Sequence, residues 1–171
     1  MLPSLRFCLA AVCCALCNVV AAQNESARDI ERAYRAGDRV QATERLDRAI
    51  QAQPQDAQLR FLKAVLLAET GRSAEAADIY QRLTQEYPEL PEPYNNLAVL
   101  YAAQGQLDKA RDALETALRN DPAYATAHEN LGDVYVQLAL QSYERAGARG
   151  AELQRKLQLA RQLVARSPRG S

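Results

Sequence analysis

The chain has 171 residues, with 21 Lys and Arg against 21 Asp and Glu and 48% hydrophobic residues, a composition that fits one globular domain, with or without a leader. A net charge of zero argues against nucleic-acid binding, because proteins that follow a phosphate backbone carry a strong excess of Lys and Arg. One His, no Trp and four Cys also leave little material for catalysis.

Residues 1–22 have the pattern of a secretory signal peptide. One basic residue, Arg6, precedes an uncharged stretch, and Val20-Ala21-Ala22 offers the small residues of a cleavage site. The apolar run is shorter than the roughly 20 residues of a spanning helix, so cleavage after Ala22 is favoured over an uncleaved membrane anchor, which stays the alternative. The segment contains all the cysteines: Cys8, Cys13, Cys14 and Cys17. The exported chain would therefore lack disulfides, a catalytic thiol and a zinc-thiolate site.

A repeat of 34 residues organises the rest of the chain. Three glycines and three prolines recur at this spacing: Gly37, Gly71 and Gly105, and Pro54, Pro88 and Pro122. The same register aligns small and large positions: Ala42, Ala76 and Ala110; Leu46, Tyr80 and Leu114; Ala49, Leu83 and Ala117. Such a period indicates stacked supersecondary units rather than a single irregular core.

Each residue type has a physical role in a helix-turn-helix unit. Ala98 and Ala110 are small where two helices cross, whereas Leu114 is large and fills the space between neighbours. Gly105 is predicted at a helix C-terminus, where a left-handed residue closes the turn at little steric cost. Pro122 is predicted at the opening of the next unit, since proline is well tolerated only in the first turn of a helix.

This pattern resembles the tetratricopeptide repeat, most closely between residues 91 and 122, where the signature positions occur in order: Tyr94, Leu97, Ala98, Tyr101, Gly105, Ala110, Leu114, Ala117 and Pro122. The resemblance implies an all-α, right-handed α-solenoid over residues 23–146. Its units are expected at 23–56, 57–90, 91–124 and, in an atypical form, 125–146. The second of these has Arg60 and Lys63 at usual core positions.

The fourth unit lacks the internal turn, so we expect one continuous or kinked helix over residues 123–146. A break at Gly147 and Gly150 is followed by a predicted amphipathic capping helix over 151–166, and the tail 167–171 is predicted to be disordered. The apolar face of the capping helix is predicted to consist of Leu153, Leu157, Leu159, Leu163 and Val164.

In this family the first helix of each unit lines a concave surface. The resemblance therefore assigns a peptide groove to Phe61, Val65, Asn95, Asn96, Val99, Glu129, Asn130 and Asp133. Asn96 and Asn130 hold the same repeat position, and amides can hydrogen-bond an extended backbone; the alternative is that they bond water or a neighbouring helix. The family's carboxylate clamp requires cations at these positions, and Glu129 and Asp133 would repel a carboxylate. A neutral, apolar or basic peptide is the better candidate ligand.

Positive charge is concentrated near the C-terminus. Residues 149–171 carry six basic residues and one acid, whereas residues 23–148 carry 14 basic and 20 acidic residues. One interpretation is that this basic end meets anionic lipid or an acidic partner. The alternative is a solvated helix with cations near its C-terminus, where the helix dipole stabilises them.

Catalytic constellations are not found. His128 takes a repeat position usually held by a large aromatic residue, so we expect it to pack structurally, and no phosphate loop, metal spacing or nucleophile elbow occurs. We therefore predict a non-enzyme without a cofactor.

The resemblance extends to small periplasmic repeat proteins of Gram-negative bacteria, which implies a periplasmic adaptor that binds protein or extended peptide and no nucleic acid. The alternative is a scaffold for an envelope complex, either self-associating as a homo-oligomer or anchored in the inner membrane.

Overall fold

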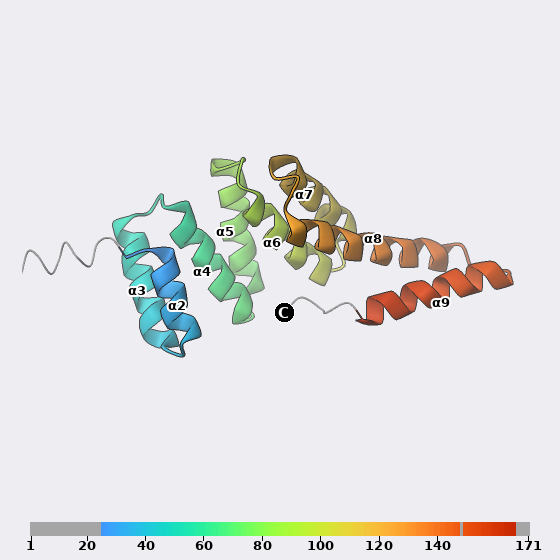
Figure 1. Ribbon diagram of the computed structural model, residues 1–171, viewed down its shortest axis with the longest axis horizontal. Helices are drawn as coiled ribbons and strands as arrows, with labels where there is room; N and C mark the ends of the chain where they lie inside the picture. Colours follow the sequence, from blue (N-terminus) through green and yellow to red (C-terminus); the bar gives the residue numbers. More distant parts are fainter. Residues whose placement is uncertain (1–24, 148, 167–171) are drawn as a thin grey trace, which may run out of the picture. The chain divides into compact units, whose positions relative to one another are not determined.

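The computed structural model describes residues 25–147 and 149–166, which form α-helices and contain no strand. The helices are α2 (Ala27–Arg35), α3 (Arg39–Ala52), α4 (Ala57–Glu69), α5 (Ser73–Glu86), α6 (Pro91–Ala103), α7 (Leu107–Asn120), α8 (Ala125–Arg145) and α9 (Ala151–Arg166) (Figure 1). The all-α class and the succession of helix-turn-helix pairs predicted from the sequence are confirmed. The chain divides into two compact units, residues 1–63 and 64–171, with the boundary inside α4.

The first unit is built around the pair α2 and α3, which pack against each other. The buried apolar residues of this pair are Ile30, Tyr34, Ala42, Leu46 and Ala49, and Leu59 and Leu62 of α4 are buried in the same unit. Lys63 lies at a usual core position, and its ammonium group forms a 2.7 Å ion pair with the Asp47 carboxylate. This pairing explains why a lysine is accepted at the edge of an apolar core.

In the second unit each helix from α5 to α9 packs on the next, and α6 also contacts α8 directly. One cluster of buried residues joins α6, α7 and α8: Ala98, Leu107, Ala110, Ala113, Leu114, Ala117, Ala127 and Val134. Consecutive packing of this kind is the arrangement of a helical solenoid. The predicted small positions Ala98 and Ala110 are both fully buried, as a close helix crossing requires.

Equivalent side-chain pairs set the register between successive repeats. The Gln81 amide on α5 donates to the Tyr101 hydroxyl on α6 at 3.2 Å. One repeat later, the Tyr135 hydroxyl on α8 donates to a Glu115 carboxylate oxygen on α7, also at 3.2 Å. Both pairs join residues 20 positions apart and lie 34 residues from each other, so the second helix of one repeat meets the first helix of the next in the same way twice.

The predicted turns are closed by glycine in the left-handed region. Gly105 has φ 73°, and its N–H donates to the Ala102 carbonyl at 2.9 Å. The following N–H, of Gln106, donates back to the Tyr101 carbonyl at 2.9 Å. This pair of hydrogen bonds satisfies the last carbonyls of α6 and turns the chain into α7. Gly37 and Gly71 end their helices with positive φ as well.

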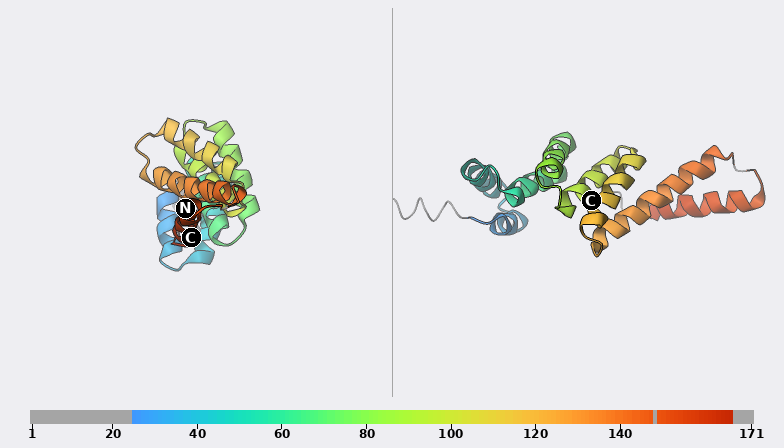
Figure 2. Two further views of the ribbon diagram at one scale, coloured as in Figure 1. Left: turned by 90° about the vertical axis from the view of Figure 1, so that its right-hand side faces the viewer. Right: turned by 90° about the horizontal axis from the view of Figure 1, so that it is seen from above.

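The fourth repeat departs from the others as predicted, because α8 is one continuous helix and the chain reverses at Gly147 and Gly150, both with positive φ. The views in Figure 2 agree that α9 runs beside α8 as the second arm of a helical hairpin. The predicted apolar face of α9 is partly wrong. Leu157 and Ala160 are buried, whereas Leu159 and Leu163 are exposed, because α9 packs on α8 through a narrow face.

None of the helices in residues 25–147 and 149–166 is long and apolar enough to cross a membrane. The predicted leader, residues 1–22, and the predicted disordered tail, residues 167–171, lie outside the described residues.

Candidate functional site

Side-chain amides form a hydrogen-bonded ladder across three helices of the second unit. Asn130 on α8 donates from Nδ2 to Asn95 Oδ1 on α6 at 2.9 Å. Asn95 donates in turn to Asn96 Oδ1 at 3.1 Å, and Asn96 donates to the Tyr80 hydroxyl on α5 at 3.0 Å. We call Asn130, Asn95, Asn96 and Tyr80 the amide ladder. It connects α5, α6 and α8 through polar atoms beside the apolar core.

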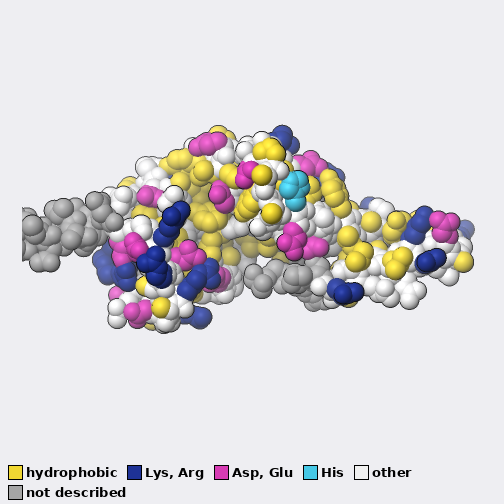
Figure 3. All heavy atoms as spheres, in the orientation of Figure 1, with side chains coloured by type: hydrophobic (Ala, Val, Ile, Leu, Met, Phe, Trp, Pro, Cys, Tyr) yellow, Lys and Arg dark blue, Asp and Glu magenta, His cyan; other side chains and the backbone are white. Residues whose placement is uncertain are grey.

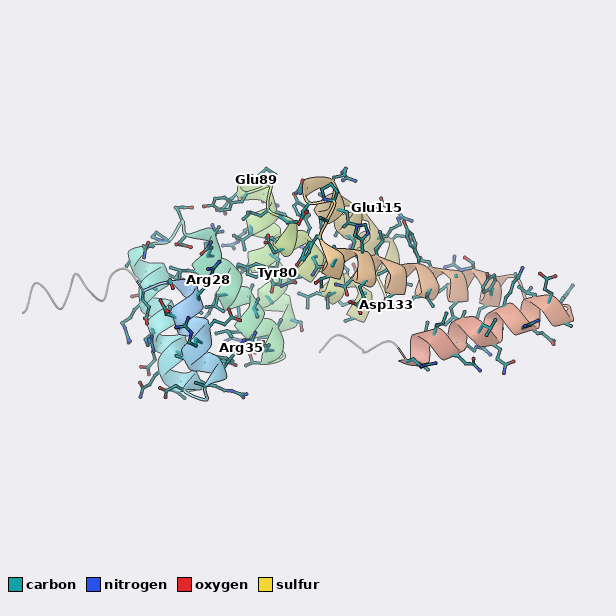
Figure 4. The ribbon with its side chains drawn as sticks, in the orientation of Figure 1. Arg28, Arg35, Tyr80, Glu89, Glu115 and Asp133 are labelled. Atoms are coloured by element: carbon teal, nitrogen blue, oxygen red, sulfur yellow. The ribbon has the colours of Figure 1, made fainter. Side chains whose placement is uncertain are left out.

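Tyr80 is the buried end of the ladder. Its side chain is 1% exposed, and burial raises the pKa of its hydroxyl to about 12; the hydrogen bond from Asn96 opposes the rise and the negative charge of Glu69 adds to it. The phenol therefore stays neutral over the physiological range. Figure 4 shows the positions of Tyr80 on α5 and Asp133 on α8.

Asn95 differs from its predicted role. We expected its amide to contact a peptide, but the side chain is 3% exposed and is enclosed by bonds to Asn96 and Asn130. A buried amide must find protein partners because it has no access to water. Asn95 thus orients the two neighbouring amides from beneath them, and of the three asparagines only Asn96 and Asn130 are partly accessible.

The other predicted groove residues are only partly accessible. Val99 on α6 and Asp133 on α8 are half-buried, and Glu129 on α8 is exposed. Val65 is half-buried on α4, and Phe61, also half-buried, belongs to the first unit. Among the predicted residues, hydrogen bonds directly join three: Asn95, Asn96 and Asn130.

Positive charge is absent from the inner helices of the second unit over most of their length. Helix α6 contains no Lys or Arg, and the first on α8 is Arg145 in its last turn. The same helices carry Glu92, Glu129 and Asp133, and Glu69 ends α4. Helix α6 and all but the last turn of α8 therefore carry acidic side chains and no Lys or Arg.

Tyr80 is the functional candidate that the predicted groove omitted. Tyr80 aligns with Leu46 and Leu114 in the 34-residue register and was interpreted as a large core residue. The available signal was its hydroxyl, because a tyrosine that replaces leucine in a core needs a hydrogen-bond partner for that group. The identity of the partner, Asn96, depends on how α5 and α6 cross.

His128 does not pack as predicted. Its ring is exposed at the start of α8, visible as the cyan group in Figure 3, and Nε2 lies 2.9 Å from the Pro122 carbonyl oxygen. The bond joins the helix to the preceding turn and leaves the ring in solvent. Within residues 25–147 and 149–166, no group of three or more His, Cys, Asp or Glu side chains could hold a metal ion.

Comparison with known families gives three matches, two described as tetratricopeptide repeat (residues 30–91 and 79–112) and one as TPR repeat (residues 100–138). Together they span residues 30–138, well over half of the chain. They cover the helix pairs from α2 and α3 to the first part of α8.

Two curated proteins share parts of the sequence. The TPR repeat-containing protein YvcD of Bacillus subtilis (strain 168) is 36% identical over 95 residues, which are 56% of this chain and 18% of that protein. The TPR repeat-containing thioredoxin TTL4 of Arabidopsis thaliana is 40% identical over 68 residues, which are 40% of this chain and 10% of that protein. The matched part is less than a fifth of the length of either relative.

The repeat period, the glycine-closed turns and the family matches agree with one another. Repeats of this kind serve protein interaction and are generally non-catalytic scaffolds. The chain belongs to the tetratricopeptide-repeat family.

Proposed function

We propose that this protein is a non-catalytic adaptor that binds an extended peptide segment rich in apolar and basic residues along the inner helices α6 and α8. The observation that carries the proposal is the charge of those helices, which hold Glu92, Glu129 and Asp133 and no Lys or Arg before Arg145. An acidic surface attracts a basic segment and repels an acidic one, and this selectivity acts on partner choice and association rate. A chain end with a free carboxylate is the ligand that this surface disfavours most.

The amide ladder supports recognition of an extended backbone. An asparagine side chain has two N–H donors and a carbonyl acceptor, and the ladder uses one N–H of Asn96 and one of Asn130. Their orientation is set by the buried Asn95 between them, so the two amides do not have to be ordered when a ligand binds. The half-buried Val99 and Val65 add apolar contact area.

Affinity in the micromolar range is expected, about −8 kcal/mol, because few anchors must offset the ordering of an extended ligand. The proposed place of action is the bacterial periplasm, after cleavage following Ala22. The signal pattern of residues 1–22 supports this location. N-terminal sequencing of the protein recovered from cells tests it: a start at Gln23 supports export, and retention of Met1 in a membrane fraction favours the anchored alternative.

The groove is tested with two fluorescent peptides of equal length, one alternating Leu and Lys and one alternating Leu and Glu, titrated against the full chain by anisotropy. We expect the Lys peptide to bind and the Glu peptide to bind at least about tenfold more weakly. Glu129→Lys with Asp133→Lys is expected to abolish the preference. The matched control reverses two carboxylates elsewhere, Asp78→Lys with Glu89→Lys; Glu89 lies on the upper edge in Figure 4, away from Asp133.

Equal binding of both peptides by the wild-type protein would contradict the proposed ligand class. An equal loss in the control variant would show that net charge, and not the inner helices, attracts the peptide. A preference that depends on Glu129 and Asp133 alone supports the adaptor function and justifies capture of partners from an extract with the same pair of variants.

A further inference from the structure

The apolar arc of helix α9 is wider than the face that α8 covers. Leu157 and Ala160 are buried against α8. Leu159 and Leu163, one helical turn apart, are 51% and 55% exposed. Side chains with this spacing lie next to each other on a helix surface, so they form one small apolar ridge on the outside of the hairpin.

Basic side chains flank this ridge. Arg155 precedes Leu159 by one turn and Arg166 follows Leu163 by nearly one turn, so helical spacing places all four on one side of α9. Lys156 is exposed near the same side and forms a 2.8 Å ion pair with Glu152. Glu152, two helical turns before Leu159, lies on the same side and offsets the charge of Lys156. We call Arg155, Lys156, Leu159, Leu163 and Arg166 the outer stripe; with Glu152 included, this side of α9 keeps a net positive charge. Figure 3 shows basic and hydrophobic side chains together along α9.

The hairpin is held together by other residues, so the outer stripe is not needed for folding. Arg161 forms a 3.1 Å ion pair with Glu144 of α8, and the buried Leu157 and Ala160 supply the apolar contact between the helices. The hydrogen bond with Glu152 raises the pKa of Lys156, so this lysine stays charged.

Charge decides between the partners that could cover the stripe. A symmetric pair of α9 helices meeting at Leu159 and Leu163 would bring Arg155 and Arg166 of each copy toward the cations of the other, which is unfavourable. The covering surface must therefore be anionic. The stripe is also convex and narrow, with two leucines between long basic side chains, whose aliphatic stems can lie on an apolar surface while the charges stay in water.

These features match a helix that lies in the plane of a membrane surface, with leucines at the acyl boundary and cations among anionic headgroups. We propose that the outer stripe docks the second unit of this protein onto an anionic lipid surface. The proposal does not depend on the peptide groove, which uses other helices.

The test is flotation of the full chain with two kinds of vesicle, one of phosphatidylcholine alone and one of equal parts phosphatidylcholine and phosphatidylglycerol. Wild-type protein is expected to partition onto the anionic vesicles at least about tenfold more strongly, and added salt is expected to reduce the difference. Leu159→Ser with Leu163→Ser removes the apolar ridge, and Arg155→Gln with Arg166→Gln removes the flanking charge. Each variant is expected to lower the partition onto anionic vesicles about tenfold.

Matched controls alter exposed residues of the same type in the first unit and on α5. Val40→Ser removes a side chain that is 74% exposed on α3, and Arg28→Gln with Arg82→Gln removes two exposed arginines. Both controls should float like wild type. Residues 1–22 are present in every variant, so any vesicle binding by this segment is the same in all of them. Unchanged helical circular dichroism confirms that the α9 substitutions leave the fold intact, and the charge variant tests the stripe even if the serine variant does not fold.

Three results would overturn the proposal. The first is equal binding to neutral and anionic vesicles, and the second is unchanged flotation of both α9 variants. The third is a wild-type protein that stays off vesicles but sediments as a dimer that the leucine substitutions dissociate, which would identify a second copy of the chain as the covering surface.

Discussion

Asn130 on α8 donates a hydrogen bond to Asn95 on α6 across 2.9 Å, joining the inner helices of two successive repeats. Asn95 is buried, so its amide has no water to replace a lost partner. The bond therefore contributes to stability and, through the adjoining bond to Asn96, to the orientation of the Asn96 amide.

Removal of either partner of this bond is expected to destabilise the protein, and the two effects should not add. Asn95→Ala leaves two half-buried amides short of a partner, and Asn130→Ala leaves a buried oxygen without its donor. Each should lower the free energy of unfolding by about 1–3 kcal/mol. The double variant should cost at least about 0.5 kcal/mol less than the sum. Urea denaturation of the four proteins measures the coupling, and strict additivity would show that the bond contributes nothing.

Ala110→Leu is expected to overpack the crossing of α7 with its neighbours. Ala110 is fully buried in the cluster that joins α6, α7 and α8. Added methyl and methylene groups have no space there, so we expect a loss of about 1–3 kcal/mol and a lower Tm. The control Ala74→Leu places the same side chain at an exposed position of α5. Equal Tm values for Ala110→Leu and wild type would show that this position is not a close helix crossing.

Two glycine-to-alanine substitutions are expected to change the stability of the protein in opposite directions. Gly105 has φ 73° in the turn between α6 and α7, whereas Gly132 is helical within α8, and an added Cβ meets no atom within 4 Å at either position. An added methyl group therefore fits equally well at both positions, and the backbone conformation decides whether it stabilises or destabilises the protein. Gly105→Ala should destabilise by about 1–2 kcal/mol, and Gly132→Ala should stabilise by about 0.5–1 kcal/mol. Thermal unfolding of both variants checks this, and a shift of the same sign in both would refute it.

The raised pKa of Tyr80 predicts that the protein loses stability at alkaline pH. Its pKa is about 12 in the folded protein and about 10 in the unfolded chain. Between these values the unfolded chain has released the proton while the folded protein keeps it, so the free energy of unfolding falls as pH rises, by about 3 kcal/mol in total. Below pH 10 this contribution is fully present.

The variant Tyr80→Phe isolates this effect, because it lacks the hydroxyl but retains every other titrating group. Its stability should be lower than that of wild type at neutral pH, and the difference should shrink as pH increases from about 10 to about 12. Denaturation at a series of pH values measures both curves. Parallel curves over this range would mean that Tyr80 ionises equally easily in the folded and unfolded states.

The sequence by itself determined the repeat architecture. A 34-residue period in Gly37, Gly71 and Gly105 predicted the turns, and alternation of small and large apolar residues predicted the helix faces that form the core. It also predicted that the fourth unit has no internal turn. These features depend on local backbone preference and on helical periodicity, which a linear sequence displays directly.

Only the tertiary structure decided which polar and apolar side chains are covered. Asn95 is buried because α8 approaches α6, and its own helix gives no sign of that approach. Leu159 and Leu163 are exposed because α9 rests on α8 through a narrow face, whereas its leucines spread over a wider arc. The exposure of His128 is of the same kind. Each depends on how helices cross, and crossing angles result from the packing of many side chains at once.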